Sequence, residues 1–477
     1  MTDLINFINN ILWSSVLIYL LLGAGIYFTL RTRFIQIRHF SHMFSVLKNS
    51  TKSDGAGISS FQALCTSLAA RVGTNNLSGV AIALTAGGPG AIFWMWVITF
   101  IGMATSFIES TLAQLYKTKD DNGHYRGGPA YYMEKGLGMR WMGVMFSIFL
   151  LIAFGLVFNA VQANSIALAS SVAFNIDPMY VGIVLVVLSA MVIFGGIRAI
   201  ARVAEKIVPF MALAYLLLAL WIIGLNIEHM PAILALIFKS AFGLQEAAAG
   251  TLGYGISQAM TQGIQRGLFS NEGGMGSAPN VAASATPYPP HPASQGYVQM
   301  LGAFVDTIVI CSATAAIILT SGALDSPPSD ISGIDLTLRA MASAVGSWGA
   351  PFVAIAVFLF AFTSIIANYA YAENNLIFLK HHHPTKLTIF RCFALGMVMF
   401  GSMAELSTVW KMADISMALM AITNLTAILL LSDVAFKLAR DYNHQRSLGK
   451  LPTFDINHYP ELGSQLEPGI WKPSRQR

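Results

Sequence analysis

The sequence has few charged residues, and its cysteines cannot form a disulfide framework. Charged side chains make up 11% of the 477 residues and hydrophobic ones 55%, whereas a soluble domain carries about 25% charged residues. Cys65, Cys311 and Cys392 lie far apart in apolar segments, which is typical of small buried hydrophobic side chains. This composition excludes an ordinary soluble domain and a disulfide-rich secreted protein.

The sequence also lacks the patterns of an enzyme. No glycine-rich nucleotide fingerprint follows a predicted strand, and the apolar segments contain neither a nucleophile beside a base nor a cluster of metal ligands. No Lys or Arg precedes Arg31, so the basic region of a cleaved signal peptide is absent and 11–30 is predicted to remain as a first helix. We therefore expect a membrane protein that is not an enzyme and needs no organic cofactor.

Apolar runs of about 20 residues recur along the whole chain, and such runs are long enough to cross a bilayer as helices. The predicted fold is an all-α integral membrane protein with about eleven transmembrane helices. Their expected ranges are 11–30, 58–86, 90–116, 141–173, 181–197, 207–227, 250–270, 298–322, 350–376, 387–403 and 410–436.

The positions of the basic residues predict the orientation in the plasma (inner) membrane. If the N-terminus lies outside, the segments after the odd-numbered helices face the cytoplasm, and they contain 24 of the 28 Lys and Arg residues. Cytoplasmic loops of membrane proteins carry this excess. The net charge of +5 therefore reflects topology; it does not indicate nucleic-acid binding, and the C-terminus is expected in the cytoplasm.

An odd number of helices suggests a division of the transporter domain at 1–440. One leading helix would be followed by two groups of five, helices 2–6 (about 58–228) and helices 7–11 (about 232–436). The two groups start on opposite sides of the membrane, which is the pattern of an inverted repeat. The polar segment 441–477 would be a cytoplasmic C-terminal tail.

One polar stretch interrupts the second helix: RVGTNNLSG, residues 71–79. Irregular backbone at membrane depth is stable only where it lines a cavity or is buried by protein. An unwound segment offers the N-terminal end of a half-helix to a carboxylate and free carbonyls to a small cation. Gly73, Thr74, Asn75 and Asn76 are therefore candidate ligands of an amino acid and Na⁺. The alternative is a packing kink with small residues at a helix contact.

Polar side chains on helices 4 and 7 could complete such a site. Asn159 and Gln162 are three residues apart and share a face of helix 4; they would hold the amino group of the ligand, or join helices by hydrogen bonds. Helix 7 carries a polar stripe that resembles the wall of a cavity. The stripe consists of Gln258, Thr261, Gln262 and Gln265, and SNEGGMG follows it.

On helix 9, the adjacent hydroxyls of Thr363 and Ser364 are oxygen ligands of the kind that suits a hard cation. Asn368 lies on the same face as Ser364. The alternative is that both hydroxyls bond back to carbonyls of their own helix. Ionisable side chains within spans are costly and often functional, and these are Arg71, Glu109, Asp306 and Glu373.

With these motifs the chain resembles the alanine or glycine:cation symporter family. The matching stretches include VGTNNLSGVAIALTAGGPGAIFWMW (72–96), RGGPAYYM (126–133), VQANSIA (161–167) and FSNEGGMGSAPN (269–280). Further matches are WGAPFVAIAVFLFAFTSIIANYAYAE (348–373) and ADISMALMAITNLTA (413–427), so the resemblance covers most of the chain.

The resemblance implies Na⁺- or H⁺-coupled uptake of small neutral amino acids such as alanine or glycine, by alternating access through a five-plus-five inverted repeat. It implies that helices 2 and 7 are broken, and that the substrate contacts residues 73–76 and Gln162. A sodium site between helices 2 and 9 would use Thr363 and Ser364. Many members have Gly-Asn where this chain has Asn75-Asn76, a change that would narrow the site or add a ligand contact.

The polar stripe of helix 7 also permits a second function, a passive channel or uniporter for small polar solutes. A symporter concentrates its solute at the expense of a cation gradient and needs a cation site, whereas a channel needs neither. The substrate-site prediction comprises Gly73, Thr74, Asn75, Asn76, Asn159, Gln162, Gln262 and Asn368, with Thr363 and Ser364 for Na⁺.

Overall fold

The structure is a computed structural model that describes residues 9, 11–48, 50–243, 252–324, 333–380 and 384–471. Within this part of the chain, eight helices are long and apolar enough to cross a membrane. They are Ile11–Arg31, Gly90–Leu115, Arg140–Phe174, Gly196–Leu225, Pro292–Thr320, Gly349–Phe378, Pro384–Met403 and Val409–Leu430. Each overlaps at least one predicted range, so the prediction of an all-α, multi-pass membrane protein is confirmed.

The other three predicted ranges are shorter or more polar than these spans. The range 58–86 is divided into α5 (Ser60–Arg71), the 3₁₀ turn η2 (Thr74–Asn76) and α6 (Ser78–Gly87). The range 181–197 forms α11 (Pro178–Ile193), which has 16 residues, and 250–270 forms α14 (Leu252–Asn271), where glycine and glutamine lower the hydropathy. The count of eleven therefore stays a prediction.

Turns of π-helix interrupt three of the long spans. The first span joins η1 (Ile11–Leu17) to α2 (Ile18–Arg31). The span Arg140–Phe174 consists of α9 (Arg140–Ile152), η3 (Ala153–Val157) and α10 (Phe158–Phe174). The span Pro292–Thr320 consists of α16 (Pro292–Ala303), η5 (Phe304–Cys311) and α17 (Ser312–Thr320). Because π-helical turns often occur at functional sites, η3 and η5 are candidate positions for such a site.

The remaining elements are long helices, short connecting helices and two-residue strands. The long helices are α7 (Gly90–Leu115), α12 (Gly196–Leu225), α19 (Gly349–Phe378), α20 (Pro384–Met403), α21 (Leu406–Leu430) and α22 (Ser432–Ser447). The shorter ones are α3 (Ile35–Arg38), α4 (Phe40–Leu47), α8 (Pro129–Lys135), α13 (Met230–Ala241), α15 (Pro279–Ala283) and α18 (Ile334–Val345). The 3₁₀ turns are η4 (Ile227–His229), η6 (Ile456–His458) and η7 (Pro460–Leu462). Strand β1 (Ile58–Ser59) pairs in parallel with β4 (Ala285–Thr286), and β2 (Thr118–Lys119) pairs antiparallel with β3 (Tyr125–Arg126).

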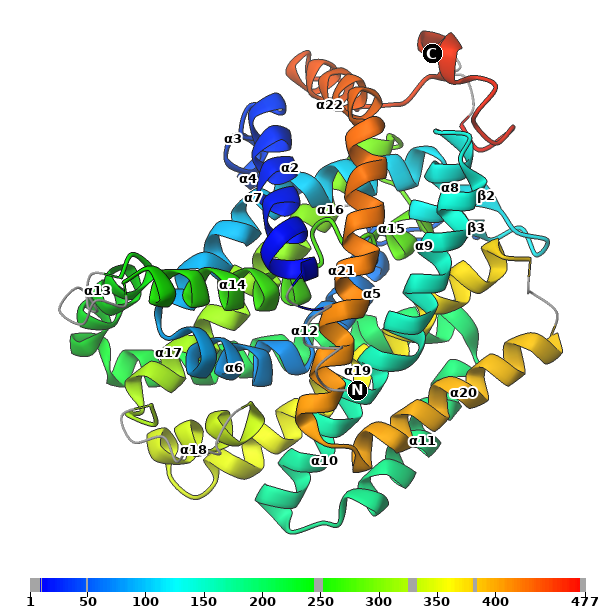
Figure 1. Cartoon of the computed structure of the whole chain (residues 1–477). Coiled ribbons are helices and arrows are strands. Elements are labelled where there is room, and N and C mark those ends of the chain that lie inside the picture. The colour runs from blue at the N-terminus through cyan, green and yellow to red at the C-terminus, as the bar shows by residue number, and fades with distance from the viewer. Residues whose placement is uncertain are drawn as a thin grey trace.

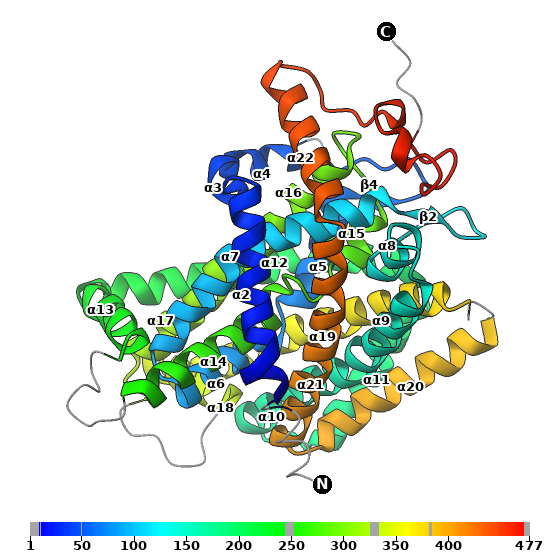
Figure 2. The same cartoon turned by 45° about the horizontal axis from the view of Figure 1, so that its top comes forward.

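The connections and the C-terminal segment gather at one end of the helices. Figure 2 shows α3, α4, α22 and the described part of the C-terminal segment at this end, and the start of the first span at the other. The segment after α22 folds back over the neighbouring loops, since Phe454 donates its N–H to the Pro290 carbonyl at 3.0 Å and the Trp471 ring N–H to the Leu115 carbonyl at 3.1 Å. The predicted tail is therefore packed onto the protein in its described part, and α22 crosses the expected boundary at 441.

Two groups of helices pack around the divided helix α5/α6. Helix α7 lies against α14 and α16, and α10 lies against α19 and α20. The approach of α20 to α10 is close, because a Cβ on Gly401 would lie 2.4 Å from the Cα of Ala160. Helices α2 and α21 run side by side on the outside (Figures 1 and 2), and the Trp13 ring N–H donates to the Asp414 carbonyl at 3.2 Å.

Candidate functional site

The break between α5 and α6 is fully enclosed by protein. Helix α5 ends at Arg71, and Gly73 has an extended backbone before the single 3₁₀ turn. Thr74, Asn75 and Asn76 are each 0% exposed. Unwound backbone without water must find partners within the protein, so the neighbours of these residues define the site.

Two amide side chains bind the backbone of the break. The Gly73 N–H donates to Asn76 Oδ1 at 3.0 Å, which caps the turn from within the segment. The Thr74 N–H donates to Gln162 Oε1 of α10 at 3.0 Å. The prediction that Gln162 faces the unwound segment therefore agrees with the geometry, and here it orients the break itself.

Asn75 and Asn76 point to two different elements. Asn75 Nδ2 donates to the Arg266 carbonyl of α14 at 2.9 Å. Asn76 Nδ2 donates to Asp306 Oδ1 at 2.7 Å, and Asp306 lies in the π-helical turn η5. The break is thus held by α14 on one side and η5 on the other.

Asp306 is part of a buried polar cluster. Its carboxylate accepts hydrogen bonds from the hydroxyl of Ser270, from Asn76 and from the hydroxyl of Thr307, the last at 3.1 Å. All four side chains are 0% exposed. Three donors satisfy the acceptor atoms of one buried carboxyl group. The sequence marked Asp306 as an ionisable group in a span, but its partners became visible only in the fold.

A second amide pair joins α10 to α19. Asn368 Nδ2 donates to Asn159 Oδ1 at 3.2 Å, and Asn159 Nδ2 donates to the Gly155 carbonyl in η3 at 3.1 Å. Both side chains are about 1% exposed. These two predicted site residues meet each other, so the interhelical hydrogen bond considered for Asn159 is present.

Several buried polar atoms at these positions lack a hydrogen-bond partner within the described part of the chain. They are Thr74 Oγ1, Asn75 Oδ1 and Asn368 Oδ1. A buried polar group without a partner costs free energy unless water or a ligand satisfies it. All three atoms are able to accept a hydrogen bond from a bound molecule.

The two adjacent hydroxyls of α19 have different roles. Ser364 Oγ donates across to the Ala69 carbonyl of α5 at 2.7 Å and lies 3.0 Å from the Phe360 carbonyl. Thr363 Oγ1 bonds back to the carbonyls of Leu359 and Phe360, at 3.0 and 2.9 Å. Both hydroxyls therefore bond back to carbonyls of their own helix, as the alternative predicted, and Ser364 in addition reaches the last turn of α5 before the break.

Gln262 is the predicted site residue that lies apart from the break. Its Cβ would be 2.8 Å from a Cβ added at Gly87, at the far end of α6, and its side chain is half-buried. The contact of α14 with the break comes one turn later, through the Arg266 carbonyl. The interpretation of the polar stripe as the wall of a cavity stays a prediction, and the residue of α14 that contacts the break is Arg266, through its carbonyl.

Two buried charge pairs were not predicted from the sequence. Arg71 Nε lies 3.9 Å from Glu272 Oε2, directly before the break, and Glu272 also accepts from the hydroxyl of Ser277 at 2.6 Å. Arg266 donates to both carboxylate oxygens of Asp414, at 2.6 and 2.7 Å. Glu272 belongs to the SNEGGMG stretch that follows the polar stripe, and Arg266 lies near the end of the predicted range 250–270. Arg266 is one of the 24 basic residues assigned to the cytoplasmic side, and its side chain is buried in the structure, 3% exposed.

The chain also has clear relatives among known proteins. The Sodium:alanine symporter family matches residues 1–456. The uncharacterized transporter YaaJ of Escherichia coli is 54% identical over 471 residues, which cover 99% of both chains. The probable sodium/glutamine symporter GlnT of Bacillus subtilis is 50% identical over 447 residues, 94% of this chain and 91% of the relative. The sodium/alanine symporter AgcS of Methanococcus maripaludis is 40% identical over 452 residues, 93% and 98% of the two chains.

Proposed function

Because the chain belongs to the sodium:alanine symporter family, and is thus a cation-coupled amino acid symporter of the membrane, we propose that the break at 72–77 is its substrate site. The substrate would be a small neutral amino acid such as alanine or glycine. The observation that carries this proposal is the set of buried acceptor atoms without partners at the break and on α19. A zwitterion would satisfy them with its ammonium group.

The two ends of such a substrate match different parts of the site. Asn75 Oδ1 and Asn368 Oδ1 accept hydrogen bonds from an ammonium group, and Thr74 Oγ1 is a further acceptor. Helix α6 begins at Ser78, and the positive end of its dipole favours a carboxylate. Gln162 and Asn159 would hold the break and α19 in place, and Gln262 would have an indirect role in the wall of α14.

The coupling Na⁺ would bind where α19 meets the end of α5. The Ser364 hydroxyl lies within 2.7 Å of the Ala69 carbonyl and 3.0 Å of the Phe360 carbonyl, and Thr363 Oγ1 lies 2.9 Å from Phe360 O. Hydroxyl and carbonyl oxygens are the ligands that a hard cation prefers. An ion that replaces these hydrogen bonds would fix α19 against α5 beside the substrate.

Replacing Ser364 by alanine is expected to raise the Na⁺ concentration for half-maximal uptake about tenfold, because the ion would lose one oxygen ligand. A tenfold change corresponds to roughly 1.4 kcal/mol of binding free energy. Ser402→Ala is the matched control, since the hydroxyl of Ser402 is buried and, among the described residues, bonds only to the Val398 carbonyl of its own helix. Uptake should be measured against Na⁺ concentration in proteoliposomes. An unchanged Na⁺ response of Ser364→Ala would place the ion elsewhere.

We also propose the orientation of the protein in the membrane, the number of transmembrane helices and the inverted repeat. We infer eleven transmembrane helices in a one-plus-five-plus-five arrangement, with the divided α5/α6 and α14/α15 at corresponding places in the two repeats. Between α14 and α15 the chain leaves helical structure after Asn271 and resumes it at Pro279. The end that carries α3, α4 and α22 would face the cytoplasm, because its segments hold most of the Lys and Arg residues.

The function is tested with purified protein in liposomes. Labelled alanine should accumulate above equilibrium under an inward Na⁺ gradient, and a proton gradient without Na⁺ measures any coupling to H⁺. Glycine and glutamine as competitors rank the substrates, glutamine because a relative carries that name. Equilibration without accumulation under every gradient would instead indicate a passive channel or uniporter.

A further inference from the structure

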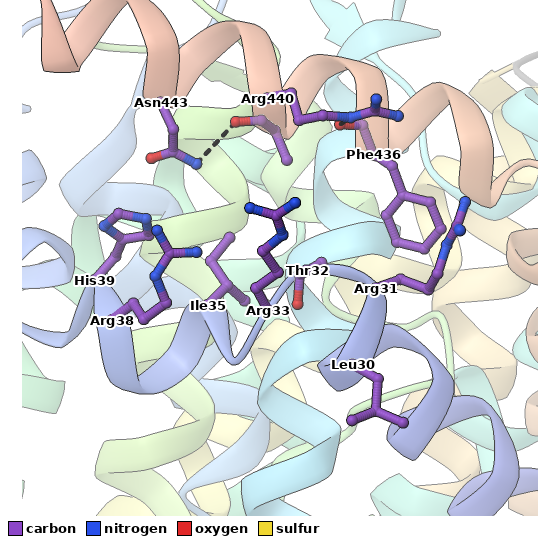
Figure 3. Close-up of a pocket in the computed structure, with 11 residues that line it drawn as sticks. Leu30, Arg31, Thr32, Arg33, Ile35, Arg38, His39, Phe436, Arg440 and Asn443 are labelled. Atoms are coloured by element: carbon purple, nitrogen blue, oxygen red, sulfur yellow. Dashed lines mark hydrogen bonds between the residues drawn. The ribbon is translucent and has the colours of Figure 1, made fainter.

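A cavity of about 520 Å³ lies outside the proposed substrate site, at the end of the protein where the first helix and α22 meet. Its lining residues come from the two ends of the chain. They are Leu30, Arg31, Thr32, Arg33, Ile35, Arg38 and His39 from the end of α2 and from α3, and Phe436, Ala439, Arg440 and Asn443 from α22. Figure 3 shows the arginines of both segments around this cavity.

The cavity has a strong excess of positive charge. Four of its lining residues are arginines, and none of the lining residues is acidic. The one ion pair at its edge joins Arg31 to Asp433 at 3.3 Å, and both side chains of that pair are more than half exposed. Arg440 Nε donates to the backbone carbonyl of Phe436 on its own helix at 3.2 Å. Within the described residues, the guanidinium groups of Arg33 and Arg38 have no acidic partner.

The turn that brings these arginines together has an unfavourable backbone conformation. Arg33 and Phe34 have φ values of 56° and 55°, a left-handed conformation that is unfavourable for residues other than glycine. This turn redirects the chain from α2 into α3. Arg33 and Arg38 thus line the cavity on one side, and α22, which carries Arg440, lies on the other (Figure 3).

His39, which also lines the cavity, adds no positive charge at neutral pH. Burial, together with the nearby charges of Arg446 and Arg38, lowers the pKa of His39 to about 4. The neutral His39 ring instead accepts a hydrogen bond, since Arg446 Nη1 lies 3.0 Å from His39 Nδ1. The charge of the cavity is thus carried by arginines, which remain protonated at any physiological pH.

Exposed apolar side chains lie on the same segments as the arginines. Leu30, Phe34 and Ile37 are 57%, 42% and 58% exposed, and Phe40 and Phe44 on α4 are also exposed. The first span ends at Arg31, so these side chains start at the membrane boundary. A basic hollow bordered by exposed apolar residues at this level fits a molecule with an anionic head and apolar chains.

We propose that this cavity binds the phosphate headgroup of an anionic phospholipid, with its acyl chains against Leu30, Phe34 and Ile37. Arginine forks match phosphate oxygens in a two-pronged geometry, and basic pockets next to transmembrane helices recognise such headgroups. Topology alone accounts for basic residues near the ends of spans. It does not account for their convergence from both ends of the chain on one hollow without acidic lining.

The test compares the purified full-length protein with the variant Arg33→Gln/Arg38→Gln in detergent. The probe is phosphatidylglycerol, and the readouts are the unfolding temperature and the number of lipid molecules retained in native mass spectra. Phosphatidylglycerol should raise the unfolding temperature of the wild type, and phosphatidylcholine should not. The variant should bind phosphatidylglycerol on the order of twentyfold more weakly, since each cation near an anionic headgroup contributes roughly a factor of five.

The matched control is Arg202→Gln/Lys206→Gln, which removes two exposed charges from α12 outside the cavity. It should bind phosphatidylglycerol like the wild type, and Arg440→Gln should weaken binding from the α22 side. Equal binding by wild type and Arg33→Gln/Arg38→Gln would overturn the proposal, as would an equal loss in the control. An equal temperature shift with inorganic phosphate would show that the ligand is a free anion and that the assignment to a lipid is wrong.

Discussion

Replacing Asp414 by alanine is expected to destabilise the protein by about 3–5 kcal/mol, the largest stability effect that the structure predicts. The change would leave the Arg266 guanidinium buried without its carboxylate partner. The side chains of the pair are 3% and 8% exposed, and both carboxylate oxygens accept from Arg266. An unpaired cation there has no water to solvate it. The measurement is thermal unfolding of the purified variant, followed by size-exclusion chromatography.

The double variant Arg266→Met/Asp414→Leu provides the decisive comparison. It removes both charges and keeps apolar volume beside Trp410, whose ring lies 4.9 Å from the Arg266 guanidinium carbon. Its unfolding temperature should recover most of the loss, because replacing both members of a buried pair is often neutral. Glu461→Ala, which breaks an exposed pair with Lys437, should leave the unfolding temperature unchanged. A single variant as stable as the double one would contradict the burial of this pair.

Gly73→Ala should reduce amino acid uptake at least a hundredfold while the protein still folds. A Cβ at this position would lie 2.5 Å from Ser364 Oγ and 2.8 Å from Gln162 Oε1. Real Cβ contacts are longer, so the methyl group would displace the Ser364 hydroxyl from the proposed ion site and the Gln162 amide from the Thr74 N–H. Losing one positioned ligand at each of two sites affects transport more than stability, since misplacement by about 1 Å removes much of a site's activity.

The matched control for this variant is Gly224→Ala on α12, where an added Cβ would meet no atom within 4 Å. Uptake should be measured with equal amounts of protein, checked by size-exclusion chromatography. Normal uptake by Gly73→Ala would mean that the break is a packing kink and that the substrate binds elsewhere. A loss of folded protein in Gly73→Ala alone would mean that the close contact serves packing first.

The sequence determined the class of the protein and the place of the break. Long apolar runs and few charges permit only spanning helices, because each backbone polar group must be paired within the bilayer. The glycine and two adjacent asparagines at 73–76 cannot remain in regular helix there without a special environment. Gln162 lies beside the break and accepts from the Thr74 N–H, while its predicted role as a substrate ligand stays a prediction.

The tertiary structure decided which polar residues meet. Arg266 was interpreted as a loop charge because its partner Asp414 lies 148 residues further along the chain, and no local pattern joins them. Thr363 and Ser364 are equivalent in sequence, but only Ser364 faces the Ala69 carbonyl. Gln262 fits the polar stripe, yet α6 covers it with Gly87. Helical periodicity determines the face of the helix on which a side chain lies. The packing of helices that are distant in sequence determines which group lies opposite that side chain. That group decides whether a polar residue binds a ligand, an ion or another helix.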